Sequence, residues 1–311
     1  MQALLDTIAH MPPPTDAARI FHGRGGMHEG CEHLSLDAFP PVLVLTSFAE
    51  LSEESIHAIG HALEQRWALI APGQPLNWVL QIRLPGGQGR TELMCGAVPP
   101  SHVVTEAGAQ YAVHVLRGQN HGLFLDMAAG RQWVRDHIAA RQASGQAGAF
   151  NVLNLFAYTC AFSVTALQAG ATHVMNMDMS RGALSIGQQN HRLNHLNAGA
   201  SFLSHDIFSS WGKITRAGPY HLVIADPPSY QKGSFVATKD YARLLRRLPD
   251  LLTRGGHALI CLNAPELPES FMHEHMREQA PELQFVERVA NPPVFADRDA
   301  DRALKVLVYR M

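Results

Sequence analysis

Three aspartates of the C-terminal half, Asp178, Asp206 and Asp226, each follow a short run with strand character. Ligands of open α/β sheets bind beyond the carboxyl ends of the strands, so we expect these carboxylates to meet at one edge of a sheet. Asp178 follows the first strand-end loop by about twenty residues, where a carboxylate can accept from both hydroxyls of a ribose. Asp206 is suited to accept from an adenine amine. The alternative is that each aspartate caps the following helix.

The loop after the first strand, Ala157-Tyr-Thr-Cys-Ala161, contains no glycine. A dinucleotide pyrophosphate requires glycine at this point, because the backbone must approach the phosphates closely. A nucleoside cofactor without phosphate makes no such demand. The loop therefore argues against NAD and is compatible with S-adenosylmethionine.

The motif Asp226-Pro-Pro-Ser-Tyr230 has the most specific pattern of the chain. Two prolines after a buried strand fix a rigid turn and remove two backbone donors. The carbonyls of such a turn can accept from an amino group on a planar substrate, and Tyr230 can stack on a base. The alternative is a proline turn that only ends the strand.

The elements that must position these residues follow a regular order. Four apolar runs alternate with helix-like segments, which predicts a doubly wound α/β fold, a mostly parallel Rossmann-like sheet with helices on both faces. Two later runs, Phe285–Val289 and Leu304–Tyr309, have no helix between them and predict a C-terminal antiparallel hairpin, an ending typical of methyltransferases. The four runs are Val152–Phe156, His173–Met177, His221–Ala225 and Ala258–Leu262.

The N-terminal half reads as a small α+β domain. Ser52, followed by two glutamates, marks the start of a helix that extends to Trp67. Asn77–Arg83 and Thr91–Cys95 flank a glycine-rich turn and predict a hairpin. The first 33 residues are rich in His, Gly and Pro and predict an irregular arm.

A second hairpin is expected from Tyr111–Leu116 and Gly122–Asp126, followed by a helix over Ala128–Arg141. The small residues of Ala143–Gly148 indicate a linker. The expected organisation is an arm at 1–33, a small α+β domain at 34–105, a hairpin and connecting helix at 106–148, and the α/β domain at 149–311.

The 311 residues carry a formal net charge of −2, and the four cysteines form no CxxC pair. This argues against a disulfide framework or zinc cluster. No apolar run approaches the ~20 residues needed to span a bilayer. We see no secretory signal and expect a cytoplasmic protein without membrane contact. His57 and His61 have a spacing that can bind a metal, but a solvated helix face explains it better, and we expect no metal.

The run Asn154–Ser163, with Asp178, Asp206 and the Asp226-Pro-Pro228 turn, resembles class I S-adenosylmethionine-dependent methyltransferases. The similarity is to the bacterial large-subunit ribosomal-RNA base methyltransferases. Glu106-Ala-Gly, Gly118–Asp126 and Arg131 extend it upstream, so that it covers about residues 40–311. These proteins often carry an additional N-terminal RNA-binding domain, which we expect this chain to lack.

The resemblance implies that S-adenosylmethionine is the cofactor and lies over residues 154–162. It places the ribose at Asp178, the adenine near Asp206 and the methyl group near Asp226, with Phe124 and Arg131 closing over the methionine end. The expected cofactor-binding residues are Phe124, Arg131, Asn154, Phe156, Ala157, Tyr158, Thr159, Cys160, Ala161, Phe162, Asp178, Met179, Ser180, Asp206, Ile207 and Asp226. The expected catalytic residues are Asp226, Pro227, Pro228, Tyr230 and Asn263.

The chain departs from the family pattern at two places. The family usually has Tyr-Thr-Gly-Gly-Phe where this chain has Tyr158-Thr-Cys-Ala-Phe162, which predicts two β-carbons crowding the cofactor loop. The family also usually has an arginine two residues after the acid of the upstream strand, where this chain has Ala128.

The residue after the fifth strand bears on which atom is methylated. Methylation of a pyrimidine carbon-5 requires attack by a thiolate, and in the cytosine-5 branch of the family that cysteine stands where this chain has Asn263. Asn263 resembles the branch that methylates a purine ring nitrogen, where catalysis is largely positioning. We favour nitrogen; the alternative is a carbon-5 enzyme that uses Cys261, and the structural reading of Cys261 is a buried thiol.

The expected partner is ribosomal RNA, and a homodimer is compatible with the sequence. Arg19, His22 and Arg24 of the arm add to a larger run of basic residues, which can bind phosphates or form a solvated helix face. The near-neutral charge leaves open a methyltransferase for a small molecule or a protein, and Cys160 and Ala161 leave open a non-catalytic RNA-binding relative. The run consists of Lys232, Lys239, Arg243, Arg246, Arg247 and Arg254.

Overall fold

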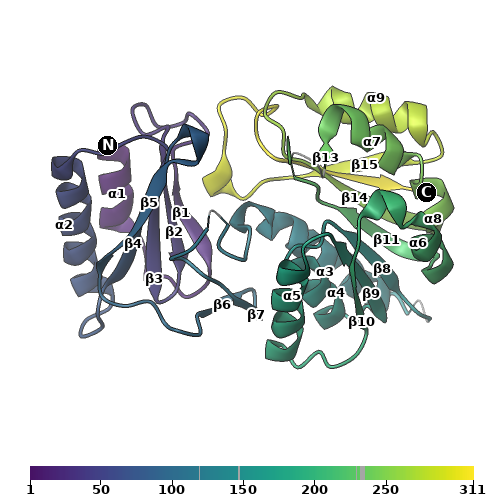
Figure 1. Cartoon of the computed structure of the whole chain (residues 1–311), viewed down its shortest axis with the longest axis horizontal. Coiled ribbons are helices and arrows are strands. Elements are labelled where there is room, and N and C mark those ends of the chain that lie inside the picture. The colour runs from purple at the N-terminus through teal and green to yellow at the C-terminus, as the bar shows by residue number, and fades with distance from the viewer. Residues whose placement is uncertain (119, 146–147, 229, 232–234) are drawn as a thin grey trace. The chain divides into compact units, whose positions relative to one another are not determined.

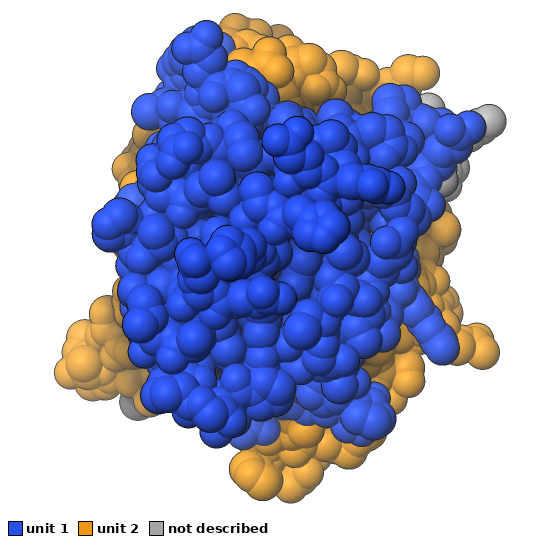
Figure 2. Space-filling model, turned by 90° about the vertical axis from the view of Figure 1, so that its left-hand side faces the viewer, with its two compact units in different colours: residues 1–126, 292–300 blue, residues 127–291, 301–311 orange. Residues whose placement is uncertain are grey.

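The structure is a computed structural model that describes residues 1–118, 120–145, 148–228, 230–231 and 235–311. The chain forms two compact units, coloured separately in Figure 2. The N-terminal unit comprises Met1–Asp126 and Pro292–Ala300, and the C-terminal unit comprises Met127–Asn291 and Asp301–Met311. No helix in the described part of the chain has the length and apolar character needed to cross a membrane.

The N-terminal unit is built on a five-stranded sheet in the order β1-β2-β3-β4-β5 (Figure 1). Parallel β3 and β4 are joined by α2 (Glu53–Ile70), which Ser52 caps as predicted, and the other neighbouring strands are antiparallel. Helices α1 (Gln2–His10) and α2 lie side by side and cover the apolar core of the sheet. The strands are β1 (Ala18–His22), β2 (Leu34–Phe39), β3 (Val42–Ser47), β4 (Asn77–Arg83) and β5 (Gly89–Cys95).

The first 33 residues differ from the predicted irregular arm, because they contain α1 and β1. Leu4 and Ile8 lie one helical turn apart and are fully buried in the core, which gives α1 its packing face. Strand β1 pairs with β2, so this part of the segment belongs to the sheet. This nine-residue helix is too short for a sequence pattern to stand out, and packing on the sheet stabilises it.

The second hairpin also differs from the prediction. It consists of β6 (Val103–Glu106) and β7 (Ala109–Ala112), and both turn residues, Ala107 and Gly108, have positive φ angles of 48° and 80°. The run Gly122–Asp126 forms no strand; Gly122 has a φ of 101°, outside the extended range. The 3₁₀ turn η2 (Leu125–Met127) leads into α3 (Ala128–Ala143).

The predicted doubly wound fold of the C-terminal unit is confirmed. Its seven-stranded sheet has the order β10-β9-β8-β11-β14-β16-β15 (Figure 1). The first five strands are parallel, and the last two form the predicted antiparallel hairpin. The strands are β8 (Asn151–Leu155), β9 (His173–Asp178), β10 (Ala200–Ser204), β11 (Tyr220–Ala225), β14 (Leu252–Leu262), β15 (Gln284–Val289) and β16 (Lys305–Arg310), and a short pair is formed by β12 (Tyr230–Gln231) and β13 (Phe235–Val236).

Alternate side chains of β8, β9, β11, β14 and β16 enter different cores, so both faces of this part of the sheet are buried. One face packs against α3 and α4 (Ala161–Gln168). The other packs against α6 (Trp211–Ala217), α7 (Ala237–Leu245), α8 (Leu248–Leu251) and α9 (Glu269–Gln279). Helix α3 therefore belongs to this unit, which moves the boundary between units to residue 127 from the predicted 149. The remaining elements of this unit are α5 (Arg181–Leu193) and the 3₁₀ turn η3 (Ile207–Ser209).

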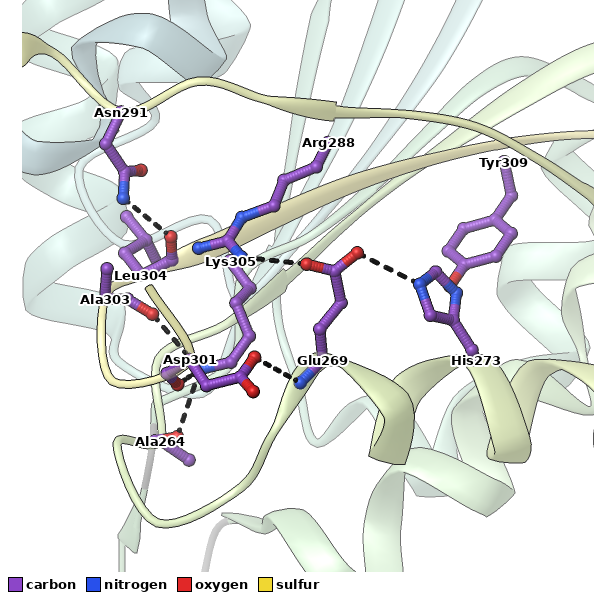
Figure 3. Close-up of polar contacts among 10 residues, drawn as sticks. All are labelled: Ala264, Glu269, His273, Arg288, Asn291, Asp301, Ala303, Leu304, Lys305 and Tyr309. Carbon is purple, nitrogen blue, oxygen red and sulfur yellow. Dashed lines mark hydrogen bonds and ion pairs between the residues drawn. The ribbon is translucent and has the colours of Figure 1, made fainter. Parts of the chain in front are cut away.

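A polar network fastens α9 to the C-terminal hairpin (Figure 3). Glu269 accepts from Arg288 at 2.8 Å and contacts His273 at 3.0 Å, and the other ring nitrogen of His273 lies 2.8 Å from the Tyr309 hydroxyl. The Asp301 carboxylate accepts from the Glu269 N–H at 3.1 Å. The hairpin is therefore tied to the first turn of the helix.

Lys305 is fully buried at the start of β16. Its ammonium donates to the carbonyls of Ala264, Asp301 and Ala303 (Figure 3). Burial lowers its pKa, and the nearby Arg288 charge adds to that effect. Because Ala264 follows Asn263, this lysine fixes the loop at the carboxyl end of β14.

One buried and two half-buried histidines make the stability of the protein dependent on pH. Burial, with nearby positive charges, lowers the pKa of His22 to about 4, of His121 to about 3 and of His257 to about 4. The folded protein keeps these rings neutral, whereas the unfolded chain protonates them below their usual pKa of about 6.5. The unfolded state then binds more protons, so acid favours unfolding.

We therefore expect the free energy of unfolding to fall as the pH is lowered from about 6.5 towards 4. Urea unfolding followed by tryptophan fluorescence at a series of pH values measures it. His121→Gln should reduce the slope, and the matched substitution of exposed His57 should leave it unchanged. A free energy of unfolding that stays constant over this range would contradict the account.

Candidate cofactor site

The predicted site segments lie along one edge of the C-terminal sheet. The chain winds outward from β8 through β9 to β10 and then returns to β11 on the other side of β8. The loops after β8 and β11 therefore diverge at a topological switch point, where ligands of such sheets bind. Leu155, the last residue of β8, pairs with Met177 on β9 and with Ala225 on β11.

The same register sets the order of the functional segments. Ser204 at the end of β10 pairs with Asp178 at the end of β9. Along the edge the structure brings together Asp206, Asp178, the loop 156–160, Asp226 and Asn263, in that order. Strand pairing therefore places segments that are far apart in the sequence next to one another.

The loop after β8 contains three strained residues. Phe156, Tyr158 and Cys160 have φ angles of 58°, 47° and 62°, in the left-handed region that favours glycine. Such a conformation costs roughly 1–3 kcal/mol for each residue and persists only where the surroundings impose it. Strain of this kind gathers at binding sites, and here it lies at the switch point.

Hydrogen bonds from neighbouring elements hold this loop. Ala157 N–H donates to the Met177 carbonyl at 3.0 Å, and Tyr158 N–H donates to Asp178 Oδ2 at 2.9 Å. The Asn190 amide of α5 donates to the Thr159 carbonyl at 2.9 Å. The loop is therefore fixed from β9 and α5 before any ligand binds.

Asp178 connects two loops through its carboxylate. Its Oδ1 accepts from Ser180 N–H at 2.7 Å while Oδ2 accepts from Tyr158 N–H. Each carboxylate oxygen has further acceptor capacity, so the group can still receive the two hydroxyls of a ribose. Ser180 itself caps α5 by accepting from Ala183 N–H at 3.2 Å, and Met179 is 52% exposed.

The Cys160 side chain does not crowd the cofactor loop as the sequence predicted. It is fully buried, and a β-carbon added to Gly187 of α5 would lie 2.5 Å from its Sγ. The thiol therefore packs against α5, with Leu184 and Phe202 beside it. Burial raises its pKa, and the Asp178 charge adds to this, so the thiol stays protonated. Ala161, the other replacement, begins α4 and is half-buried.

Two residues of the predicted cofactor run lie beneath the loop. Asn154 is buried and donates to the Asn176 amide oxygen at 2.9 Å, and Asn176 in turn donates to Ser163 at 3.0 Å. Phe162 packs in the core between α3 and α4. Both side chains support the loop from the protein interior.

Asp206 acts as a cap, as the alternative interpretation allowed. Its carboxylate accepts from Phe208 N–H at 3.0 Å at the start of η3, and Ile207 is buried in the core. Capping uses one acceptor position of a group that has several, so the carboxylate can still accept from a ligand.

The turn after β11 lies next to the strained loop. Asp226 N–H donates to the Leu155 carbonyl at 3.5 Å; Pro227 is buried and Pro228 half-buried. Tyr230 begins β12, and Ser229 and Lys232 lie outside the described residues. Asn263 is exposed after the end of β14.

Cys261 is fully buried, two residues before Asn263. It packs in the core on the α3 and α4 face of the sheet, among Leu222, Leu259 and Val306. Its backbone carbonyl accepts from the buried Tyr241 hydroxyl. A thiol enclosed in this way cannot contact a substrate base, which favours a structural role for Cys261.

Two aromatic residues near the site were missed in the sequence. Phe235 lies edge-on to Phe156 of the strained loop, with ring centroids 5.3 Å apart, and Phe208 stacks on Phe235 at 6.4 Å. The Arg243 guanidinium lies 4.1 Å from the Phe208 ring centroid. About eighty residues separate Phe156 from Phe235, and sequence periodicity reports only local neighbours.

The predicted basic run is spread over several elements, and its members make separate contacts. Arg243 pairs with Asp240 on α7 at 2.9 Å, and Arg246 donates to Gln279 of α9. Arg247 lies over the Trp211 ring, and Arg254 is near the amino end of β14, far along the strand from Asn263. Basic residues that are close in the sequence therefore lie on different elements of the structure.

The two residues expected at the methionine end belong to different units. Arg131 is a buried residue of α3 in the C-terminal unit, and Phe124 is 40% exposed in the N-terminal unit. Among the residues that the structure describes, no three His, Cys, Asp or Glu side chains are placed to hold a metal ion.

A family model for S-adenosylmethionine-dependent methyltransferases matches residues 18–310, nearly the whole chain. The chain belongs to this family. The match includes the strained loop, the three aspartates and the C-terminal hairpin.

Relatives of this methyltransferase agree with that assignment. Ribosomal RNA large subunit methyltransferase I of Serratia proteamaculans is 29% identical over 286 residues, which is 87% of this chain and 69% of the relative. A SAM-dependent methyltransferase from Streptococcus mutans has the same fold, with a TM-score of 0.81 at 21% identity, over 100% of this chain and 81% of the other. A second methyltransferase structure, complexed with SAH, has a TM-score of 0.80 at 21% identity over the same shares.

The packing of Cys160 against Gly187 gives a prediction. Gly187→Val should destabilise this methyltransferase by about 2 kcal/mol, because the added atoms overlap Sγ in a packed interface. Cys160→Gly should leave S-adenosylmethionine affinity unchanged, because the thiol faces α5. Chemical unfolding and calorimetric titration measure the two effects. Loss of cofactor affinity in a stable Cys160→Gly variant would show that the thiol faces the ligand.

Proposed function

We propose that this methyltransferase transfers a methyl group to a base nitrogen of ribosomal RNA, with the ribose of S-adenosylmethionine bound at Asp178 and the adenine beside Asp206. The observation that carries the proposal is the alignment of Asp178, the strained loop and the Asp226 turn at the switch point of the sheet. Relatives named as ribosomal RNA large subunit methyltransferases support RNA as the substrate.

The residues at the sheet edge fit the chemistry of this cofactor. A nucleoside without phosphate needs a hydroxyl acceptor rather than a cradle of glycine N–H groups, and Asp178 supplies a partly exposed carboxylate with remaining acceptor capacity. The loop beside it is held by hydrogen bonds to β9 and α5, so little ordering is needed on binding. The absence of glycine from residues 157–161 therefore does not hinder this ligand.

The chain's own residues supply orientation rather than a nucleophile. Bound S-adenosylmethionine provides an electrophilic methyl group. The Asp226-Pro-Pro228 turn lacks two backbone donors, so its carbonyls and carboxylate favour an amino group on the base. A ring nitrogen already carries the lone pair that attacks, and holding it in line with the methyl group is the main catalytic task.

Burial of Cys261 favours nitrogen over carbon-5 as the acceptor. The carbon-5 reaction forms a bond between a thiolate and the pyrimidine ring, which an enclosed side chain cannot reach. Asn263 at the exposed strand end has no nucleophilic group, and its amide can donate to or accept from a base. The cytoplasmic location and the homodimer stay predictions.

Asp178→Ala should weaken S-adenosylmethionine binding at least about tenfold, because hydrogen bonds from the ribose to a charged acceptor are lost. Isothermal titration calorimetry measures the dissociation constant for S-adenosylmethionine. Asp136→Ala, at an exposed position of α3, is the matched control and should bind normally. Thermal unfolding checks that the loop tied to Asp178 remains folded. Normal affinity in Asp178→Ala would refute the ribose assignment.

Labelled S-adenosylmethionine should transfer its methyl group to ribosomal RNA in preference to metabolite and protein fractions. Cys261→Ala should retain this activity, and nucleoside mass spectrometry should place the methyl group on a base nitrogen. Label confined to metabolites or proteins would overturn the RNA substrate. Loss of RNA methylation in a folded Cys261→Ala variant would revive the carbon-5 mechanism.

A further inference from the structure

Three arginines gather at one end of the sheet in the N-terminal unit. Strand pairing places the ends of β1, β3 and β4 side by side there, since His22 pairs with Ser35 on β2, and Ser47 pairs with both Leu34 and Ile82. Arg19 lies on β1, Arg24 follows β1, and Arg83 ends β4. We refer to Arg19, Arg24 and Arg83 as the arginine cluster.

One aromatic ring organises two members of the cluster. The guanidinium of Arg24 lies 4.2 Å from the centroid of the Phe48 ring, and that of Arg83 lies 5.9 Å from the same centroid. Phe48 follows β3 and is half-buried. Contact with one ring limits the freedom of both side chains, so less entropy is lost when they bind a ligand.

Positive charge in the cluster exceeds the carboxylates that pair with it. Asp37 is taken by Arg19 in a two-pronged contact of 2.6 and 3.0 Å. Within the described part of the chain, neither Arg24 nor Arg83 forms an ion pair with a carboxylate, although Asp126 attracts Arg24 from a longer range. The Arg83 Nε–H is buried without an acceptor among those residues.

The neighbouring groups respond to this charge. Partial desolvation lowers the pKa of Arg24 although the residue is exposed, and Arg19 lowers it further. Burial lowers the pKa of half-buried Arg83, and Arg19 and Arg24 add to this effect against the opposing Asp37. His22 and His121 are neutral at pH 7 for the same reasons. Three positive charges held together repel one another and so lower the stability of the folded protein. A bound anion would relieve this repulsion, which indicates that the cluster is an anion-binding site.

We propose that the arginine cluster binds a backbone phosphate of the RNA substrate. The planar guanidinium offers paired donors that match phosphate oxygens, and Arg24 is exposed to receive them. Such a contact carries no base specificity and serves to position the RNA. The inference rests on the proposed function only in naming RNA as the source of the phosphate.

The test uses the full chain and a fluorescein-labelled polyuridylate oligonucleotide, with binding followed by anisotropy over a series of salt concentrations. Arg24→Gln combined with Arg83→Gln should raise the dissociation constant by about tenfold. It should also reduce the salt slope by about 0.7 for each phosphate that the variant no longer neutralises. Arg24→Gln alone should show part of both effects. Because Arg24 is exposed, this variant replaces the double variant if the latter folds poorly.

Arg90→Gln is the matched control, because Arg90 is an exposed arginine of the same unit that pairs with Glu50 and Glu92. It should leave the salt slope unchanged, and all variants should bind S-adenosylmethionine normally. Equal affinity and slope in wild type and Arg24→Gln, with RNA methylation intact in wild type, would overturn the cluster but keep the proposed function. A wild type that neither binds polyuridylate nor methylates RNA would overturn both.

Discussion

The carboxylate of Asp178 holds the candidate site together, because it accepts one hydrogen bond from the strained loop and one from the start of the next helix. Without that anchor, three non-glycine residues in left-handed conformations would have little reason to stay there. The same oxygens are the acceptors proposed for the cofactor ribose. One group thus shapes the backbone and presents the binding surface.

Packing on both sides of the sheet supports this anchor. Beneath the loop, Asn154, Asn176 and Ser163 form a buried hydrogen-bonded chain that ends at His191 of α5. On α5, Gly187 leaves room for the Cys160 thiol, so the helix accommodates a side chain at a position where the loop's conformation favours glycine. On the other side of the switch point, Lys305 fixes the loop that follows Asn263. These contacts hold the described parts of the edge that follow β8 and β14.

Local patterns predicted most of the C-terminal unit. The alternation of apolar runs with helical segments indicated the sheet, and the missing helix before Leu304 indicated the final hairpin; both are confirmed. The sequence did not show where the Cys160 side chain points, because that depends on Gly187, which is distant in the chain. Likewise α1 is stabilised by a core that no local pattern shows, and Arg83 joins Arg24 only through strand pairing. The periodicity of the sequence predicts local elements but not the contacts between segments that are distant in the chain.

We propose that the nucleoside of the cofactor lies across the carboxyl ends of β8, β9 and β10. A crystal structure of the protein with S-adenosylhomocysteine tests it most directly. We expect both ribose hydroxyls within hydrogen-bonding distance of the Asp178 carboxylate, the adenine beside Asp206, and the loop 156–160 unchanged. Density for the ligand elsewhere, or an Asp178 side chain turned away from the ribose, would contradict the account.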